Sequence, residues 1–515
     1  MQIFQQQKKD FKCIIKSVFC MKSKKINSNQ KIAIIGAGPG GLAASLLLAH
    51  QGHEVTIYEK NDRVGGRSSV IQLDNFSFDA GPTFFIYRYV LDEVFKRIGK
   101  KLEDYVTLKP IEPLYDLYFT NKVFRPYQDH SKMMKEIHRV FPGEENGYQL
   151  YLKKESRRLK KLLPILQLPF HSPFQILNPK VLSALDEIDL GKSLYQRLKK
   201  FFHQDELIFS MAFQAKYLGM SPWECPSIFS MLSFMEHEYG VYHVMGGLYQ
   251  LNVAMAKLAA EMGVTIKLAQ HVQKMEVEKK CIHRIKVNQK WIKVDQVVLN
   301  GDFSQAIQLI DEKSRPKRYQ NNQLSKLKYS CSTFNLYLGL DKIYPIAHHN
   351  VIFSKDYAQY VKELTKDLTL SKDPSFYIQN PSIIDRSFAP ENQSSMYILV
   401  PVPNLKANLD WKEISKSYTE LILSRIEKLP GMKDLRKHIV KQHVLTPLDW
   451  QNQYHVYLGA NFNLSHDFSQ LLYFRPHNRF QRFKNLYLVG GGTHPGSGLP
   501  TIYQSALIAA DLIGS

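Results

Sequence analysis

The sequence has no long apolar run and no closely spaced cysteines. Its uninterrupted apolar stretches all fall short of the roughly 18 residues that a membrane-spanning helix requires, which predicts a chain that is soluble or lies on a membrane surface. The cysteines show neither C-x-x-C nor Cys/His spacing, so we expect no disulfide framework and no zinc or other metal site. These cysteines are Cys13, Cys20, Cys225, Cys281 and Cys331.

Acidic residues are scarce relative to basic ones. The 515 residues include 68 Lys and Arg against 47 Asp and Glu, and the formal net charge of +21 favours anionic partners such as nucleic acid or phospholipid. Apolar residues make up 44% and charged residues 22% of the chain, as in ordinary globular proteins. A chain of this length can build two or three folding units.

A glycine-rich motif follows the first predicted strand. Residues 31–35 have the composition of a short buried parallel strand, and residues 42–50 have that of a helix. Between them lies a G-x-G-x-x-G pattern, whose bare backbone allows a tight turn, a close approach to a pyrophosphate, and close packing of helix against strand. The pattern comprises Gly36, Gly38, Pro39, Gly40 and Gly41.

An acid follows the second predicted strand, over residues 54–58. This acid, Glu59, stands near the spacing of roughly 20 residues at which a carboxylate binds the ribose hydroxyls of adenosine. No arginine replaces it, so a 2′-phosphate is not expected in the ligand. The alternative interpretation is a glycine turn in some other α/β unit.

Two more glycine-rich segments extend the pattern. Residues 62–67 supply two glycines for close backbone approach and two guanidinium groups suited to phosphate. Near the other end, a predicted strand over 485–489 runs into a glycine-dense loop over 490–500 and a predicted helix over 501–511. Each loop can bring backbone next to a flat or anionic ligand, so we expect the two ends of the chain to form one site.

These motifs together resemble the flavin amine oxidase and carotenoid desaturase superfamily. The string G-G-G-T-H-P-G-S-G-L-P is similar to the closing signature of bacterial-type phytoene desaturases, including the dehydrosqualene desaturases, and the likeness covers all but about the first 30 residues. It implies FAD that is bound non-covalently, because the closing loop lacks the cysteine that carries the flavin in amine oxidases. The implied cofactor-binding residues are Gly36, Gly38, Pro39, Gly40, Gly41, Glu59, Lys60, Gly65, Gly66, Arg67, Gly81, Pro82, Val272, Gly491, Gly492, Thr493, Gly498, Leu499 and Pro500.

The resemblance implies an α/β fold in which a GxGxxG Rossmann-like FAD-binding domain carries an inserted α+β substrate domain. A helix over 251–262, a strand over 264–277 and a return strand over 297–302 are expected to belong to the FAD-binding domain. The expected FAD-binding segments are residues 31–90, 236–305 and 480–515, and the expected substrate-domain segments are residues 91–235 and 306–479.

The implied reaction is desaturation of a long polyene precursor such as phytoene. A hydride passes to flavin N5 and a proton leaves the neighbouring carbon, which forms a conjugated double bond. Such a substrate offers almost nothing to hydrogen-bond, so we expect binding by apolar burial and no conspicuous acid/base pair, and no catalytic residue is identified. A single dinucleotide motif indicates oxygen or a quinone as the electron acceptor.

Several alternatives remain open on the same fold. The family resemblance also fits a carotenoid oxygenase or isomerase, and the superfamily includes amine and protoporphyrinogen oxidases. A more distant alternative is a non-enzymatic binder of prenyl chains, like the Rab escort and GDP-dissociation inhibitor proteins. The sequence leaves open whether the substrate has thirty or forty carbons and how many double bonds are introduced.

Residues 151–202 combine cations with apolar stretches that are broken by proline. This pattern predicts contact with an anionic membrane surface, with the apolar residues of 162–170 and 173–177 dipping into lipid. The alternative is an ordinary helical cap, and a nucleic-acid partner is not expected. We therefore expect a cytoplasmic protein that is peripherally attached to membranes. The cations are Lys153, Lys154, Arg157, Arg158, Lys160, Lys161, Arg197, Lys199 and Lys200.

Three other segments invite a specific interpretation. Residues 1–30 form a basic tail, which is either a disordered extension with the true start at Met21 or a membrane-surface or targeting segment. Residues 465–467 read Ser-His-Asp, but consecutive side chains point apart, so we interpret them as a structural loop. His348 and His349 lack acidic or cysteine partners at ligand spacing and are assigned to the structure of the substrate domain.

Overall fold

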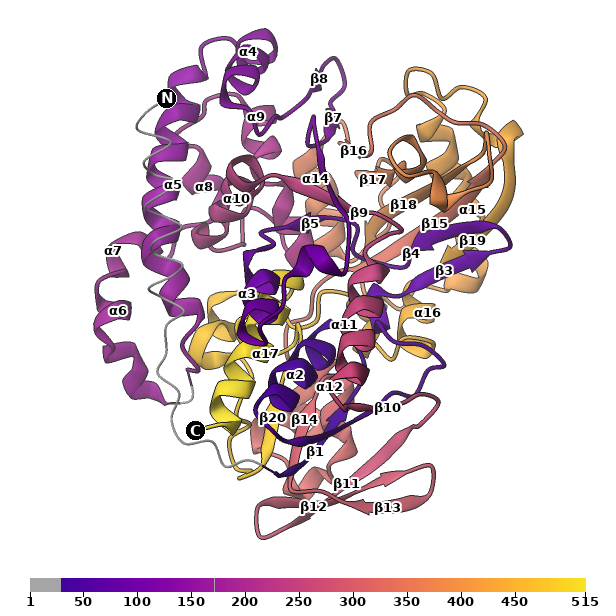
Figure 1. The fold of residues 1–515 in the computed structure, drawn as a ribbon. Coiled ribbons are helices and arrows are strands. Elements are labelled where there is room, and N and C mark those ends of the chain that lie inside the picture. Colours follow the sequence, from indigo (N-terminus) through magenta and orange to yellow (C-terminus); the bar gives the residue numbers. More distant parts are fainter. Residues whose placement is uncertain (1–28, 171) are drawn as a thin grey trace.

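The computed structural model describes residues 29–170 and 172–515 of the chain (Figure 1). At its centre lies a five-stranded parallel sheet with the strand order β10-β2-β1-β14-β20. The sheet collects strands from both ends and the middle of the chain. The strands are β1 (Lys31–Ile35), β2 (Glu54–Tyr58), β10 (Thr265–Lys267), β14 (Gln296–Leu299) and β20 (Leu486–Leu488).

Helices cover one face of the parallel sheet (Figure 1). Helix α2 (Pro39–His50) packs against both α11 (Tyr249–Glu261) and α17 (Leu499–Ile513), and α3 (Tyr89–Arg97) packs against α17. Because α2 has neighbours on both sides as well as the sheet, its residues from Gly40 to Leu48 are buried. This burial explains why the helix is apolar all round instead of amphipathic.

The opposite face of the parallel sheet packs against a three-stranded antiparallel sheet. Ala33 and Val297 share a core with Met275 and Ile285, whereas Ile34 belongs to the core on the helical face. The side chains of each strand alternate between the two faces, as the period of a strand requires. The antiparallel strands are β11 (Val272–Glu278), β12 (Cys281–Val287) and β13 (Lys290–Lys293), and the short helix α12 (Phe303–Ala306) follows β14.

The prediction of one strand over 264–277 is wrong. The structure divides this stretch into β10, which is an edge of the parallel sheet, and β11, which belongs to the antiparallel sheet. The chain leaves one sheet and enters the other over residues 268–271, where Ala269 adopts a positive φ of 52°. A run of apolar residues alone does not reveal such a change of sheet.

A seven-stranded mixed sheet forms the second layer of the molecule, with the order β19-β15-β18-β17-β16-β7-β8. On β15, Phe334 and Leu336 face a core built with α15 (Trp411–Ile426), and Asn335 lines a cavity on the opposite face. The strands are β7 (Asp116–Tyr118), β8 (Val123–Phe124), β15 (Ser332–Leu340), β16 (His349–Ile352), β17 (Phe376–Gln379), β18 (Ser394–Val402) and β19 (Ile439–Leu445).

A group of helices packs beside these two sheets (Figure 1). The longest is α5, whose buried side contributes Tyr151, Leu159 and Leu162 to the main core. The members are α4 (His130–Val140), α5 (Glu145–Leu166), α6 (Pro179–Leu182), α7 (Leu185–Ile188), α8 (Leu194–Leu198), α9 (Asp205–Ser210) and α10 (Met231–Tyr239). The remaining short helices are α13 (Asn321–Leu324), α14 (Tyr357–Lys362) and α16 (Pro447–Asn452).

One small sheet crosses the predicted domain boundaries at 90/91 and 235/236, and another packs across the division. β9 pairs with both β5 and β6, although β6 lies in the expected substrate domain and the other two in the expected FAD-binding domain. The hairpin of β3 and β4 packs against β19 and β18. The predicted division therefore runs through paired strands, and it stays a prediction. The strands are β3 (Val70–Leu73), β4 (Phe76–Asp79), β5 (Phe85–Ile86), β6 (Leu108–Ile111) and β9 (Val241–Val244).

The interpretations of the basic tail and of Met21 concern residues 1–28, which lie outside the described residues. Within the described ranges, no helix is both long enough and apolar enough to cross a membrane.

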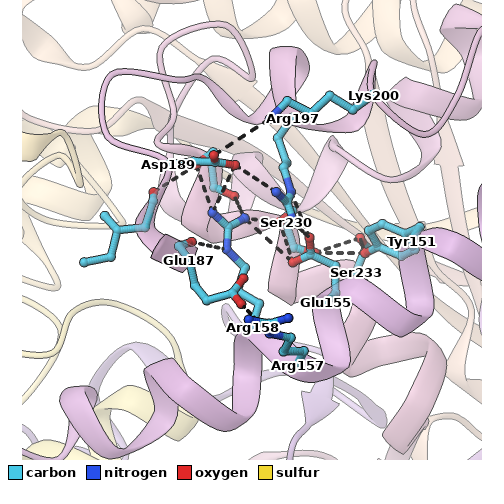
Figure 2. A network of polar contacts seen from close by, with 12 residues as sticks. Tyr151, Glu155, Arg157, Arg158, Glu187, Asp189, Arg197, Lys200, Ser230 and Ser233 are labelled. Atoms are coloured by element: carbon cyan, nitrogen blue, oxygen red, sulfur yellow. Dashed lines mark hydrogen bonds and ion pairs between the residues drawn. The ribbon is translucent and has the colours of Figure 1, made fainter. Parts of the chain in front are cut away.

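Two of the cations that the sequence predicts at a lipid surface are buried in a polar network (Figure 2). Glu155 of α5 accepts hydrogen bonds from Arg197 Nε at 3.0 Å and from Arg197 Nη2 at 2.8 Å. Arg197 Nη1 also donates to Asp189 Oδ2 at 2.8 Å. Arg158 donates to the carbonyl oxygens of Glu187 at 2.7 Å and of Ser227 at 2.8 Å. The prediction is wrong for Arg158 and Arg197, because carboxylates and carbonyls from other elements bind them inside the protein.

The apolar residues of 162–190 fall into a buried group and an exposed group. Leu162, Leu163, Ile165 and Phe170 are buried in the main core, so the prediction that they dip into lipid is wrong. Other apolar side chains remain outside. The exposed ones and their exposed fractions are Phe174 (76%), Leu177 (64%), Leu182 (48%), Leu185 (46%) and Leu190 (70%).

We expect Glu155→Gln to destabilise the protein strongly. The change removes a carboxylate that is 0% exposed and leaves two buried guanidinium groups short of a counter-charge, which typically costs about 3–5 kcal/mol. The urea midpoint measures this loss. Glu206→Gln is the matched control, because Glu206 forms a partly exposed ion pair with Lys122 at 3.6 Å and such pairs contribute at most about 1 kcal/mol. Equal midpoints for the two variants would contradict the expectation.

Candidate functional site

The turn between β1 and α2 is built from backbone that leaves no room for side chains. Gly36 adopts a positive φ of 100°, which favours glycine. A Cβ at Gly41 would lie 2.3 Å from the Gly36 carbonyl oxygen, and one at Gly40 would lie 2.7 Å from the side-chain oxygen of Asn300. The close packing of helix against strand that the sequence predicts is therefore present, and it exposes the N-terminus of α2 toward a cavity.

Asn300 holds this turn in place, although no sequence motif singled out its side chain. Its side chain follows the last residue of β14 and donates from Nδ2 to the carbonyl oxygen of Gly36 at 3.0 Å and that of Gly38 at 3.4 Å. The backbone N–H of Asn300 donates to the carbonyl oxygen of Ile35 at 2.9 Å. Its signal is a polar residue directly after a buried parallel strand, at the sheet edge where ligands bind in this type of fold.

Glu59 is positioned at the end of β2 beside the glycine turn. Its Oε2 accepts from the backbone N–H of Ala37 at 2.8 Å, and its Oε1 accepts from that of Asn61 at 2.9 Å. A carboxylate has about four acceptor positions, so capacity remains for two ribose hydroxyls. Lys60 also lines the cavity, where burial lowers the pKa of its ammonium group to about 8.

Arg67 enters the same cavity from the second glycine pair. Gly65 has a φ of 103°, and a Cβ at Gly81 would lie 2.6 Å from the Arg67 carbonyl oxygen. The guanidinium donates to the carbonyl oxygen of Asn461 at 2.6 Å and has no ion-pair partner among the described residues. Burial lowers the pKa of this guanidinium, and the nearby Asp302 partly opposes the shift. A pyrophosphate group would supply the missing negative charge.

The closing loop between β20 and α17 lies directly against the first glycine turn. A Cβ at Gly40 would be 3.1 Å from Ile502 Cγ2 and 3.4 Å from the nitrogen of Gly490. The backbone N–H of Gly490 donates to Oγ of Ser505 at 2.9 Å. This hydrogen bond ties the first residue of the loop to helix α17. The two glycine-rich segments from opposite ends of the sequence therefore meet in space.

A buried arginine supports the closing loop from behind. Arg475 is 1% exposed and directs all its donors at backbone carbonyls, including Gly491 at 2.8 Å and Thr493 at 3.1 Å. Its other acceptors are the carbonyl oxygens of Leu464, Ser465 and Gln470. His466 adds to this support by accepting from the backbone N–H of Ser497 at 3.0 Å. These contacts are consistent with our interpretation of residues 465–467 as structural.

One cavity of about 560 Å³ joins the glycine turns to the mixed sheet. Among the predicted cofactor-binding residues, those that line it are Gly36, Gly38, Pro39, Gly40, Glu59, Lys60, Gly65, Gly66, Arg67, Gly81, Pro82, Val272, Gly491, Gly498, Leu499 and Pro500. This arrangement of bare backbone at a helix N-terminus, an acid with free acceptor positions and a guanidinium without an ion-pair partner among the described residues fits a flavin dinucleotide.

Three predicted residues do not line the cavity. Gly41 packs on the Gly36 carbonyl instead, and a Cβ at Gly492 would lie 2.5 Å from Cβ of Phe303. Thr493 points into the protein and donates from Oγ1 to the carbonyl oxygen of Pro476 at 2.6 Å. These three residues contribute to the packing of the first glycine turn and of the closing loop. Their direct contact with the cofactor stays a prediction, because none of them lines the cavity.

The far end of the cavity is largely apolar and carries few hydroxyl groups. The sequence did not assign these side chains to a site, because they come from separate strands, a loop and a short helix that meet only in the folded protein. The apolar residues are Phe84, Ile86, Phe213, Val351, Phe376 and Leu399, and the hydroxyl-bearing ones are Thr83, Thr333, Tyr377 and Tyr397.

Comparisons with known proteins agree with this arrangement. A family model described as flavin-containing amine oxidoreductase matches residues 39–514. The chain is 42% identical over 487 residues to a 4,4'-diapophytoene desaturase (4,4'-diapolycopene-forming) from Methylomonas sp, covering 94% of this chain and 95% of the relative. It is 34% identical over 499 residues to a 4,4'-diapophytoene desaturase (4,4'-diaponeurosporene-forming) from Staphylococcus aureus (strain Newman), covering 93% and 98%.

The fold also occurs among solved structures. Cyclohexylamine oxidase from Brevibacterium oxydans IH-35A superimposes with a TM-score of 0.58 at 15% identity, and the match covers 95% of this chain and 100% of the other. At that identity the likeness concerns the fold alone. Together with the central parallel sheet, the comparisons confirm the predicted fold class and the predicted family resemblance.

We expect Gly41→Ala to weaken flavin binding by at least about tenfold, or about 1.4 kcal/mol. The added methyl group would lie 2.3 Å from the Gly36 carbonyl oxygen, so the turn and the helix N-terminus must move apart. Titration of the flavin-free protein with FAD measures the affinity. Gly514→Ala is the matched control, because its Cβ would meet only the flexible side chain of Gln51. Equal FAD affinities in the two folded variants would contradict the role of the turn.

Proposed function

The chain belongs to the family of flavin-containing amine oxidoreductases, and we propose that it is an FAD-dependent desaturase that forms conjugated double bonds in a long apolar polyene precursor. The observation that carries this proposal is one continuous cavity, which is lined both by the dinucleotide-type turns and by an apolar wall of the mixed sheet. The identity of 42% to a diapophytoene desaturase along almost the whole chain favours a precursor of that kind.

The proposed cofactor is FAD held without a covalent bond. Gly38 and Gly40 at the α2 N-terminus and Arg67 would bind its pyrophosphate, and Glu59 would bind its ribose. When bound, the flavin supplies a two-electron acceptor for a hydride. The described cysteines, Cys225, Cys281 and Cys331, are absent from the cavity lining, which supports non-covalent binding.

Substrate binding is proposed to depend on burial of hydrocarbon. Binding is stabilised by about 25 cal/mol for each Å² of apolar surface that is removed from water. A long polyene can bury apolar surface along its whole length. The alternatives of an oxygenase or isomerase act on similar chains. An amine oxidase is less favoured, because the chain shares 15% identity with the solved amine oxidase and 42% with a desaturase.

Oxygen or a quinone is the proposed electron acceptor. The described residues contain one parallel sheet with one glycine-rich dinucleotide turn, which would be filled by FAD. Either acceptor can reach reduced flavin without a second nucleotide-binding domain.

We expect purified protein to bind FAD and to desaturate diapophytoene. Incubation under air or with a quinone should convert the colourless substrate into products whose absorption moves to longer wavelength with each added double bond. Parallel reactions with phytoene compare the forty-carbon chain with the thirty-carbon one. Peroxide release with amines, together with no change in either polyene, would overturn the proposal in favour of an amine oxidase.

We also propose that the protein is cytoplasmic and that residues 174–190 attach it to the surface of an anionic membrane. Five apolar side chains of this stretch are exposed, and Lys153, Lys154 and Lys160 on the neighbouring α5 have no ion-pair partner among the described residues. Phe170 lies next to this stretch and packs against His494 of the closing loop, with ring centroids 5.3 Å apart. A lipid-dissolved substrate would then enter near the loop that borders the cavity.

We expect the protein to float with vesicles that contain anionic lipid and to be released by salt. Leu177→Asp combined with Leu190→Asp should reduce the floated fraction severalfold, because both side chains are well exposed and would place charge in the lipid. Val440→Asp is the matched control, since Val440 is an exposed apolar residue of β19, outside the proposed surface. An equal loss in both variants, or no flotation of the unmodified protein at low salt, would contradict the proposed surface.

A further inference from the structure

A chain of hydrogen bonds leads from the cavity wall into the buried mixed sheet. The hydroxyl oxygens of Thr83 and Tyr377, which both line the cavity, are 2.9 Å apart. Tyr377 Oη is also 2.6 Å from Nδ1 of His349. The sequence assigns His349 to structure only, but the structure connects it to the cavity through one phenol.

The pairing of β16 with β17 sets this contact. His349 is opposite Gln379 in the register, so Tyr377 is its diagonal neighbour on the same face of the sheet. The ring of Phe84 stacks on the His349 ring with centroids 4.0 Å apart and an interplanar angle of 13°. His349 is 0% exposed, and both the register and the stacked ring fix its orientation.

Further ionisable groups lie behind His349. The adjacent His348 contacts His243 Nδ1 through Nε2 at 3.1 Å, and His243 Nε2 contacts Asp385 Oδ2 at 2.9 Å. Burial lowers the pKa of His349 well below its usual value, and the charge of His243 acts in the same direction. His349 is therefore neutral at rest, with one nitrogen free to accept a hydrogen bond.

The proposed desaturation requires a proton acceptor. Removal of a hydride leaves an allylic cation, and the neighbouring C–H bond then becomes strongly acidic. A weak base is sufficient at that stage, but it must lie at the substrate in a cavity that is mostly apolar. Tyr377 is the one hydroxyl in the described cavity lining that is bonded to an imidazole.

We propose, on the basis of the proposed desaturase function, that Tyr377 accepts the proton that leaves the substrate. His349 acts through Tyr377 as a proton relay, because it receives the phenol's own proton and later gives it up. The phenol oxygen accepts one hydrogen bond from Thr83 and keeps a second lone pair for the substrate. It takes the proton from carbon while its own proton passes to His349 Nδ1.

This step balances in atoms and electrons. The C–H bonding electrons remain on the substrate and form the new double bond, the hydride is taken up by the flavin, and the proton resides on His349 as imidazolium. The oxygen or quinone that receives the two electrons also takes up two protons overall, so the imidazolium returns its proton when the flavin is reoxidised. The low proton affinity of a buried imidazole favours that return.

Two other groups could compete for this role. Tyr397 also lines the cavity, but its hydroxyl has no hydrogen-bond partner among the described residues and therefore has no relay. Glu236 is buried behind the wall, where it accepts from Tyr115 at 3.0 Å and from Gln214 at 2.7 Å, and burial raises the pKa of its carboxyl group to about 7. It does not itself line the cavity.

The decisive comparison is Tyr377→Phe against Tyr397→Phe. Each variant removes one phenol hydroxyl from the same cavity, and only the first removes the relay. In anaerobic single turnovers with diapophytoene, we expect Tyr377→Phe to slow formation of the conjugated product by about 100-fold or more and Tyr397→Phe to change it by less than about threefold. Deuterium at the carbon that loses the proton should give a larger isotope effect in Tyr377→Phe. Equal rates in the two variants, or a large loss in Glu236→Gln with none in Tyr377→Phe, would overturn the assignment.

His349→Asn separates proton transfer from positioning. An amide oxygen can still accept a hydrogen bond from Tyr377 but cannot take up the proton, so we expect a rate as slow as that of Tyr377→Phe. A rate close to that of the unmodified protein would overturn the relay role of His349.

A measurement without substrate tests the contact independently of activity. In the ¹⁵N spectrum of the resting protein, the Nδ1 signal of His349 should shift in Tyr377→Phe and stay unchanged in Tyr397→Phe. An unchanged signal in both variants would overturn the hydrogen-bonded pair, whatever the protein catalyses. If the signal shifts as expected but no polyene bleaches the flavin of the unmodified protein, the proposed desaturase function fails and this proton-accepting role fails with it, while the contact stands.

Discussion

Close backbone contact after β1 is the constraint on which the rest of the site depends. The turn can approach a ligand only because Gly36, Gly40 and Gly41 carry no side chains, and a single methyl group at Gly41 would lie 2.3 Å from a carbonyl oxygen. Glycine-rich backbone is flexible, so side chains of other residues must stabilise the conformation of the turn. Asn300 does this for the first turn and Arg475 for the closing loop, in both cases by donating to carbonyl oxygens.

The parallel sheet explains how distant segments meet at this turn. β1, β2 and β14 run in the same direction, so Gly36, Glu59 and Asn300 emerge together at their carboxyl ends. β20 adds the closing loop at the same edge, from the last part of the chain. The mixed sheet then closes the far side of the cavity, which allows one fold to join a site for a charged dinucleotide to an apolar one.

The sequence predicted the parts of the site that depend on local pattern. A strand, a glycine turn and a helix are consecutive, and the predicted strands at 31–35 and 54–58 match β1 and β2. Contacts between distant elements could not be predicted in this way. Tyr377 meets His349 through strand register, and Arg197 is neutralised by Glu155 of another helix, so neither charge counts nor spacing reveals them. The predicted lipid contacts of Arg158 and Arg197 were wrong for the same reason.

The apolar wall makes its few polar groups informative. In a cavity suited to hydrocarbon, a buried hydroxyl without a partner costs free energy, because it loses its hydrogen bonds to water. Tyr397 bears that cost, whereas Tyr377 is satisfied on both sides by Thr83 and His349. A hydrogen-bonded phenol keeps its position and orientation beside an apolar substrate, and it can pass a proton on without itself becoming charged. The chemistry proposed for this protein requires a group that is both fixed in position and able to transfer a proton, at one point of an otherwise apolar wall.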